Sequence, residues 1–223
     1  MIGTGAMCDP YMHCEKQLEM TKKCLEIIDY YGFGFAVQTK SDGVLRDLEL
    51  LKSVNEKAKC VVQMTLTTYE EELCRIVEPC VCTTKKRFET FQILKENGIP
   101  TVVWLSPLLP FINDTKENVE GVLDYCIKAG VHGVICFGMG LTLREGNREY
   151  FYKALDKYFP GMKEKYQRKY GFAYEITSEN HSQLMGIFHE TCRKNHIMSN
   201  VGQVFDYLHY FPENKGYEQL SLF

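Results

Sequence analysis

The sequence lacks the basic charge, the long apolar run and the leader segment that would direct a protein to nucleic acid or to a membrane. Its 26 Lys and Arg residues are outnumbered by 29 Asp and Glu residues, so no overall basic field favours nucleic acid. The longest apolar stretch, 102–112, is interrupted by Ser106, Pro107 and Pro110 and is far too short to span a bilayer. Because Met1 leads into Ile-Gly-Thr-Gly rather than a basic and then an apolar segment, we recognise no signal peptide and expect a cytoplasmic location.

Cysteine is abundant, but the spacing of a metal site is lacking. The only close groupings are Cys8 with Cys14 and Cys80 with Cys82, and neither has the two-residue gap of zinc knuckles or redox dithiols. Most of the other cysteines, Cys24 among them, fall in apolar periodic segments, where a thiol acts as a small core hydrophobe in a reducing cytosol. We therefore predict no metal site made of these cysteines.

The pattern that is present is a repeat of strand, polar turn and helix. Three amphipathic stretches end in a glycine that is followed by an apolar residue, at Gly32, Gly98 and Gly130. Each pattern predicts a helix closed by a left-handed glycine that turns into a buried strand. This order is typical of parallel β/α units, whose ligands gather at the carboxyl ends of the strands. The length of 223 residues suits one such domain.

The pattern predicts five strands separated by helices, followed by a region where the repeat stops. The strands are expected at 1–6, 33–38, 60–66, 101–105 and 133–137. The helices are expected at about 15–31, after Ser41 as a cap, after Thr68 with Glu71 at capping-box spacing, at 84–96, from Asp114 to Gly130, and at 145–158. After residue 160 we expect two polar helices rich in aromatics, 163–170 and 178–194, and a tail.

The first predicted strand has no element before it to cover its edge. A parallel strand with no element before it leaves a sheet edge uncovered, which folds of this class normally protect. The chain looks as though it starts late, and we expect association through this exposed strand.

Several segments resemble one enzyme superfamily in both order and spacing. They are Gly3–Tyr11, Gln38–Ser41, Glu78-Pro79, Arg87, Asn97–Ile99 and Ser106–Asp114. Together they are similar to the radical S-adenosylmethionine superfamily, and most of all to its spore-photoproduct-lyase-like branch. The likeness covers roughly residues 2–144, and the aromatic helices that follow also resemble the C-terminal region of that branch.

The resemblance implies an α/β fold, a partial (β/α)6 TIM-type barrel that lacks its first β/α unit. Residues 1–159 would form the barrel, and 160–223 a helical, aromatic-rich extension packed on it. Such proteins bind S-adenosylmethionine and a [4Fe–4S] cluster and generate a 5′-deoxyadenosyl radical. They hold the cluster with Cys-x3-Cys-x2-Cys after the first strand, and this sequence has no such spacing. The cluster is therefore not expected on this chain as given, whether through a truncation, a late start or a degenerate copy.

The resemblance also implies cofactor-binding residues, and each has a structural interpretation beside the functional one. Small residues at the end of the first strand either pair with the methionyl amine or allow close packing. Polar residues after later strands either contact the ligand or cap helices, and Arg87 either binds a carboxylate or lies solvated on a helix. The residues are Gly3, Thr4, Gly5, Thr39, Lys40, Thr65, Arg87, Ser106 and Asn113.

The substrate is not implied by any motif. The aromatic residues between 151 and 174, interleaved with Lys163, Lys165, Arg168 and Lys169, are either a packing lid or a surface that stacks a nucleobase. Nucleic acid is a conceivable partner that the net charge does not favour, and a small-molecule cofactor is the expected one. The alternative function is a non-catalytic barrel remnant that binds a nucleotide or a protein partner.

Overall fold

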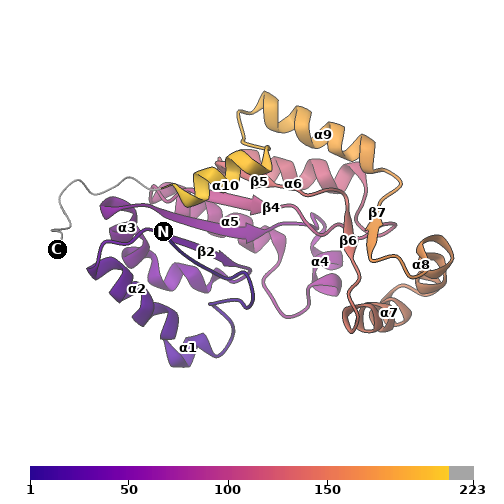
Figure 1. Cartoon of the computed structure of the whole chain (residues 1–223), viewed down its shortest axis with the longest axis horizontal. Helices are drawn as coiled ribbons and strands as arrows, with labels where there is room; N and C mark the ends of the chain where they lie inside the picture. The colour runs from indigo at the N-terminus through magenta and orange to yellow at the C-terminus, as the bar shows by residue number, and fades with distance from the viewer. Residues whose placement is uncertain (211–223) are drawn as a thin grey trace, which may run out of the picture.

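The computed structural model describes residues 1–210 and is built on an open parallel sheet (Figure 1). Its five strands stand in sequence order and all neighbouring pairs are parallel. Each connection is therefore a crossover, as the β/α repeat predicted. The sheet does not close into a barrel, and its two edge strands are the first and the last. The strands are β1 (Ile2–Thr4), β2 (Phe35–Thr39), β3 (Cys60–Thr65), β4 (Thr101–Trp104) and β5 (Gly133–Ile135).

Helices cover one face of this sheet. Alternate strand residues such as Val37, Met64 and Val103 point into the main core, where they meet apolar residues of the covering helices, for example Leu51 and Phe91. The helical elements up to β5 are α1 (Glu15–Leu18), α2 (Met20–Tyr30), η1 (Asp42–Asp47), α3 (Leu48–Lys57), α4 (Glu71–Val77), α5 (Thr84–Glu96) and α6 (Lys116–Ala129). A later helix, α9 (His181–Lys194), packs against α6 and adds Phe188 to the same core.

The opposite face of the sheet is covered by α10 (Val201–His209). Val61, Val102 and Ile135 of three adjacent strands bury themselves under Val204 and Leu208 of this helix. The prediction of a tail after residue 194 was therefore wrong. The helix is too short for periodicity alone to reveal, and it forms because an apolar stripe packs on the sheet.

A small second lobe stands at the other end of the molecule from α2. It contains β6 (Gly140–Thr142), α7 (Asn147–Tyr158), α8 (Met162–Tyr170) and β7 (Glu175–Thr177). The two strands pair antiparallel, and Leu143, Leu155, Tyr166 and Ile176 share one buried cluster. Residues from before and after position 160 thus contribute to the same small core. The sequence predicted the two helices, but the three-residue strands gave no periodic signal.

The residues that cap the N-termini of the helices were only partly predicted. Ser41 caps η1 through its hydroxyl, which accepts from Gly43 N, as expected. The helix after β3 is capped instead by Glu70, whose carboxylate accepts from Glu72 N and Leu73 N, so the capping role of Thr68 was wrong. The helix before Gly130 is capped by Thr115 rather than by Asp114.

Two further expectations fail on the first helical segment. The expected helix over 15–31 is broken at Glu19, which has a left-handed φ of 49° between α1 and α2. Cys24, expected in the core, is exposed on α2. Gly32, Gly98 and Gly130, by contrast, have the predicted positive φ values.

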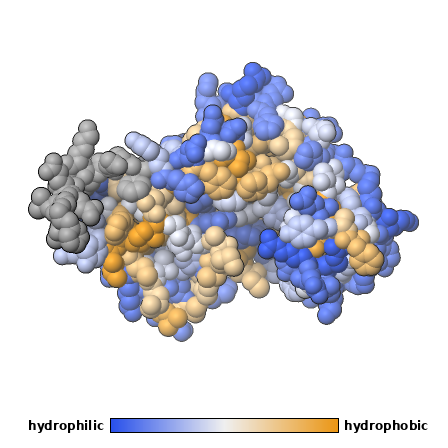
Figure 2. All heavy atoms as spheres, in the orientation of Figure 1, coloured by the Kyte–Doolittle hydropathy of each residue, from blue (hydrophilic) through white to orange (hydrophobic). Residues whose placement is uncertain are grey.

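Hydrophobic side chains also gather on the surface near β1, α1 and α2 (Figure 2). Ile2, Ile27, Tyr30, Tyr31 and Phe33 are all exposed there. Over residues 1–210, no helix combines the length and the apolar character needed to cross a bilayer.

Candidate functional site

The residues predicted from the sequence meet at one edge of the sheet, where the parallel strands end. Gly3 and Thr4 lie on β1, Thr39 is the last residue of β2, Thr65 is the last residue of β3, and Ser106 follows β4 by two positions. The edge thus collects segments that are distant in sequence. Parallel α/β sheets bind their ligands at this edge.

A charged cluster stands where β2 and β3 end. Glu78, after α4, pairs with Lys40 through Oε1 and with Arg87 through Oε2, the latter at 2.9 Å. Burial by itself would raise the pKa of Glu78, but the charges of Arg87 and Lys40 and their hydrogen bonds lower it below its ordinary value. Glu78 is therefore ionised at neutral pH, and the three side chains carry a net charge of about +1.

Arg87 is the least expected member of this cluster. Its side chain is 0% exposed, so the interpretation as a solvated helix residue is wrong. Its Nη1 donates to Thr65 O at 2.7 Å as well as to Glu78, while Nε and Nη2 have no hydrogen-bond partner among residues 1–210. Buried guanidinium N–H groups are costly to leave unpaired, so this position suits an enclosed acceptor such as a buried water.

The hydroxyl of Thr39 is already used in hydrogen bonds within the chain. Its hydroxyl donates to Asp9 Oδ1 at 2.6 Å and accepts from Ser41 N at 3.0 Å. Asp9 also accepts from Lys40 N at 2.8 Å and, through Oδ1, from Tyr11 N at 2.9 Å. Asp9 thus forms its own turn and ties the loop after β1 to the end of β2, which leaves the side chain of Lys40 as the polar group that this segment presents.

Gly5 is required by packing. It has a φ of 102°, and a Cβ at this position would lie 1.9 Å from Gln38 O, a main-chain atom. Gly3 is different, since the nearest atom to a methyl group added there would be Ala36 O, at an ordinary 4.0 Å. The structural interpretation of the small residues therefore accounts for Gly5 and not for Gly3.

Asn113 fastens the loop after β4 to the end of β3. Its Nδ2 donates to Thr67 O at 3.2 Å and Thr68 Oγ1 at 3.0 Å, and its Oδ1 accepts from Leu109 N at 2.6 Å. Asn118, which the sequence did not single out, donates to Thr67 O at 2.8 Å. With every polar atom of its amide used, Asn113 shapes the edge of the site rather than offering free groups to a ligand.

A cavity of about 490 Å³ opens beside the ends of β4 and β5. Trp104, Ser106, Phe137 and His181 line it together with residues of β6 and β7. This volume is within the usual range for small-molecule sites. Thr65, whose carbonyl accepts from Arg87, pairs in register with Trp104 of the cavity wall, so the charged cluster and the cavity are linked through neighbouring strands, although no residue of the cluster lines the cavity.

The aromatic wall of the cavity is held in place by one polar contact. The indole Nε1 of Trp104 donates to Gln63 Oε1 at 2.9 Å, and its ring lies 6.0 Å from that of Phe137. Elsewhere in the cavity lining, His181 Nδ1 accepts a hydrogen bond from Met139 N at 3.3 Å. The sequence analysis missed all of these residues. The available signal was the alternation along β3, which puts Gln63 and Thr65 on one face.

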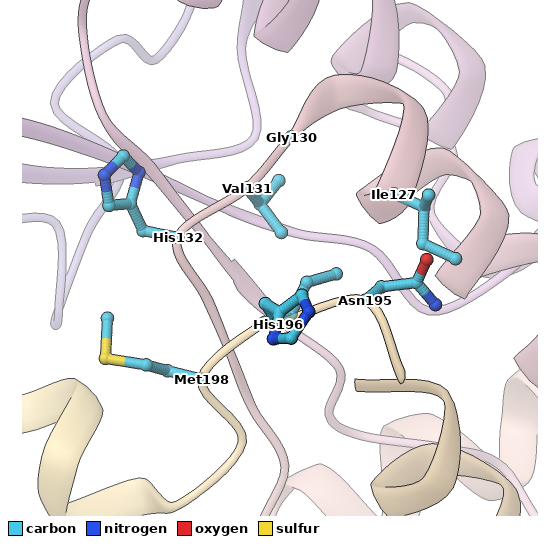
Figure 3. A pocket seen from close by; sticks show the side chains of 8 residues that line it. Ile127, Gly130, Val131, His132, Asn195, His196 and Met198 are labelled. Atoms are coloured by element: carbon cyan, nitrogen blue, oxygen red, sulfur yellow. The ribbon is translucent and has the colours of Figure 1, made fainter. Parts of the chain in front are cut away.

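A second hollow, of about 410 Å³, lies at the opposite, amino edge of the sheet (Figure 3). Figure 3 shows Asn195 and His196, from the segment after α9, beside Ile127 and Val131 at the end of α6. Burial, followed by the charge of Lys59, lowers the pKa of His132 in its lining. This edge contains none of the residues that the sequence indicated, so we assign the candidate site to the carboxyl edge.

No group of three or more His, Cys, Asp or Glu side chains within residues 1–210 is arranged to hold a metal ion. All ten cysteines are free thiols. Of the two close groupings, Cys8, Cys14 and Cys80 are exposed, whereas Cys82 donates its thiol to Lys40 O at 2.8 Å. Burial is the main cause that raises the pKa of Cys82, which disfavours the thiolate that a metal would bind.

Comparison with known proteins finds relatives without an assigned activity. No family model matches the sequence. An uncharacterized protein of Mycobacterium tuberculosis is 26% identical over 169 residues, which cover 76% of this chain and 49% of the relative. An uncharacterized protein of Methanocaldococcus jannaschii is 32% identical over 115 residues (52% and 43% of the two chains). An uncharacterized protein of Acidianus two-tailed virus is 34% identical over 146 residues (64% and 46%). The chain thus spans about half the length of these relatives.

Proposed function

We propose that this chain is the S-adenosylmethionine-binding β/α part of a cytoplasmic radical S-adenosylmethionine enzyme, the superfamily that its sequence resembles. One observation carries the proposal. Lys40, Glu78 and Arg87, which belong to three separate segments of that resemblance, form one charged cluster at the carboxyl edge of the sheet. A chance likeness of short motifs would not require these segments to converge.

The two parts of the site suit the two ends of S-adenosylmethionine. A methionyl carboxylate would pair with Lys40, whose side chain is 37% exposed, while the buried Arg87 holds Glu78 in place and keeps the cluster cationic overall. The adenine would lie against the aromatic wall of Trp104 in the neighbouring cavity. Thr65 stands between the two parts, and its hydroxyl forms no hydrogen bond to any residue from 1 to 210, so it can serve the ribose.

The residues described do not fit the iron–sulfur cluster of the superfamily. The cysteines have neither the spacing nor the grouping of cluster ligands. We therefore derive no catalytic step through a cluster. The proposal requires its ligands to come from outside residues 1–210, while this part of the chain binds and orients the nucleoside and keeps water from it.

Isothermal titration with S-adenosylmethionine tests the proposal. Lys40→Ala and Thr65→Val should each weaken binding by about 1 to 3 kcal/mol, the usual cost of removing a buried polar partner. Lys86→Ala is the matched control, since this lysine is half exposed on α5 and, within residues 1–210, forms an ion pair only with Glu89, three residues later. If both site variants bind as tightly as the parent, the assigned pocket is wrong.

The alternative of a non-catalytic barrel remnant predicts a different titration result. The same cationic and aromatic groups could hold a nucleotide through its phosphates. Tighter binding of AMP or ATP than of S-adenosylmethionine, with the same dependence on Lys40, would favour that alternative over the enzyme.

A further inference from the structure

His181 places a hydrogen-bonding side chain in the wall of the cavity beside β4 and β5. It is the first residue of α9, and it lines the same cavity as Trp104 and Ser106. Among residues 1–210, the lining includes no Lys or Arg, so the cavity offers no cation to a carboxylate or a phosphate. It therefore suits an uncharged part of a ligand, one with an apolar face and a polar edge.

The main chain fixes which nitrogen of the His181 ring can face a ligand. Met139 N donates to Nδ1 at 3.3 Å, so Nδ1 is the acceptor and the neutral imidazole carries its proton on Nε2. Nε2 forms no hydrogen bond to any residue from 1 to 210. The Nε2–H group is thus a free donor in the cavity lining.

The ring is also held in place by its surroundings. Ser178 N donates to Met139 O at 2.8 Å and His181 N donates to Ser178 O at 3.2 Å, so the loop after β5 and the start of α9 are bonded in both directions. Gly138 leaves room for the imidazole, since an added Cβ would lie only 3.2 Å from His181 Cε1. β7 leads directly into α9 (Figure 1), which fastens this start to the small lobe. A donor held in this way loses little freedom when a ligand binds.

We propose that His181 recognises the adenine base of S-adenosylmethionine by donating Nε2–H to one of its ring nitrogens. Stacking on Trp104 accepts any flat base, whereas an N–H donor requires an acceptor on the edge of the ring, which adenine has. His181 is therefore a specificity-determining residue, at the opposite end of the ligand from Lys40. The inference rests on the proposed function because it needs a ligand that carries adenine.

Two substitutions separate a ligand-binding role of His181 from a structural one. In His181→Asn the amide oxygen takes the place of Nδ1 and still accepts from Met139 N, but no donor reaches the position of Nε2. In His181→Gln the longer side chain brings an amide N–H to that position and loses the contact with Met139. Isothermal titration with S-adenosylmethionine should show about tenfold weaker binding in His181→Asn and less than about a threefold change in His181→Gln. A residue that only fastened Met139 would give the reverse order.

The matched control is His189→Asn. His189 is exposed on the same helix and does not line the cavity, so this variant should bind like the parent. Thermal unfolding of each variant checks that the chain is folded at the temperature of the titration.

A shorter ligand assigns the contact to the base. 5′-Methylthioadenosine keeps the adenine and the ribose but has no methionyl carboxylate. His181→Asn should weaken its binding by the same factor of about ten, whereas Lys40→Ala should leave its binding unchanged.

The outcomes distinguish this inference from the proposed function. If the parent binds S-adenosylmethionine in a way that depends on Lys40, and His181→Asn binds it as tightly as the parent, the role of His181 is wrong and the proposed function stands. Weaker binding in His181→Gln than in His181→Asn also overturns the role of His181. If the parent binds neither ligand, both proposals fail.

Discussion

Glu78 offers the sharpest test of the charged cluster, because it is an anion held between two cations. In Glu78→Gln the side chain keeps its size and one acceptor oxygen but loses its charge. Arg87, at 0% exposure, then has Thr65 O and a weaker amide contact in place of an ion pair. The variant therefore leaves a buried guanidinium without a counter-charge.

The expected loss follows from that burial. Breaking a buried pair by removing one partner costs about 3 to 5 kcal/mol, and we place this variant near 3 kcal/mol because an acceptor remains. Lys40, with 37% of its side chain exposed, can regain solvation and adds little. Urea unfolding at pH 7, followed by circular dichroism, measures the loss. Glu120→Gln, which removes an exposed i,i+4 pair with Lys116, should cost at most about 0.5 kcal/mol. A loss below about 1 kcal/mol in Glu78→Gln would refute the reasoning.

The same cluster predicts a pH dependence. Because the folded pKa of Glu78 is lower than its ordinary value of 4.5, the unfolded chain takes up a proton more readily than the folded one as the pH falls. The contribution of Glu78 is fully present well above the ordinary value and is lost as the pH falls through the folded pKa. The stability difference between the parent and Glu78→Gln should therefore be constant near neutrality and shrink in acid. A difference that grows on acidification would contradict the assigned direction.

Two further outcomes test the backbone of the site and its cofactor content. Gly5→Ala should destabilise the fold by about 3 kcal/mol, because its φ is 102° and a methyl group there meets Gln38 O in the main chain. Gly32→Ala, at a φ of 69° and facing open space, should cost about 1 kcal/mol. Thermal unfolding of both variants compares them directly. After anaerobic reconstitution, the chain as given should bind no stoichiometric iron and sulfide by chemical analysis, and the broad absorption of a cubane cluster would contradict this.

The parts of the fold that the sequence predicted are those with strong local signals. The parallel sheet followed from glycine-closed helices and apolar strands, and the helix over 84–96 begins and ends where its pattern does. The missed parts depend on tertiary contacts. α10 is stabilised by the sheet under Val204, and β6 and β7 are three-residue strands that exist only as a pair. The open sheet also differs from the barrel that the resemblance implies.

The position of the candidate site could be predicted from the sequence, but its ion pairs and its cavity could not. Strand ends located Lys40, Thr65 and Ser106 at one edge, because all parallel strands end there. The resemblance named both Arg87 and the Glu78 segment, but the sequence does not show that they pair with each other, since a helix arginine is usually solvated. The cavity was missed for a similar reason, because it is formed between the strand ends and a lobe from later in the chain.

Fluorescence of Trp104 tests the central claim most directly. It is the only tryptophan of the chain and it lines the cavity, so its emission reports occupancy of the carboxyl edge. The account predicts a saturable change on titration with S-adenosylmethionine, shifted to higher ligand concentration in Lys40→Ala and unaltered in Lys86→Ala. An emission that does not respond to millimolar S-adenosylmethionine, or a response that Lys40→Ala leaves unchanged, would contradict it.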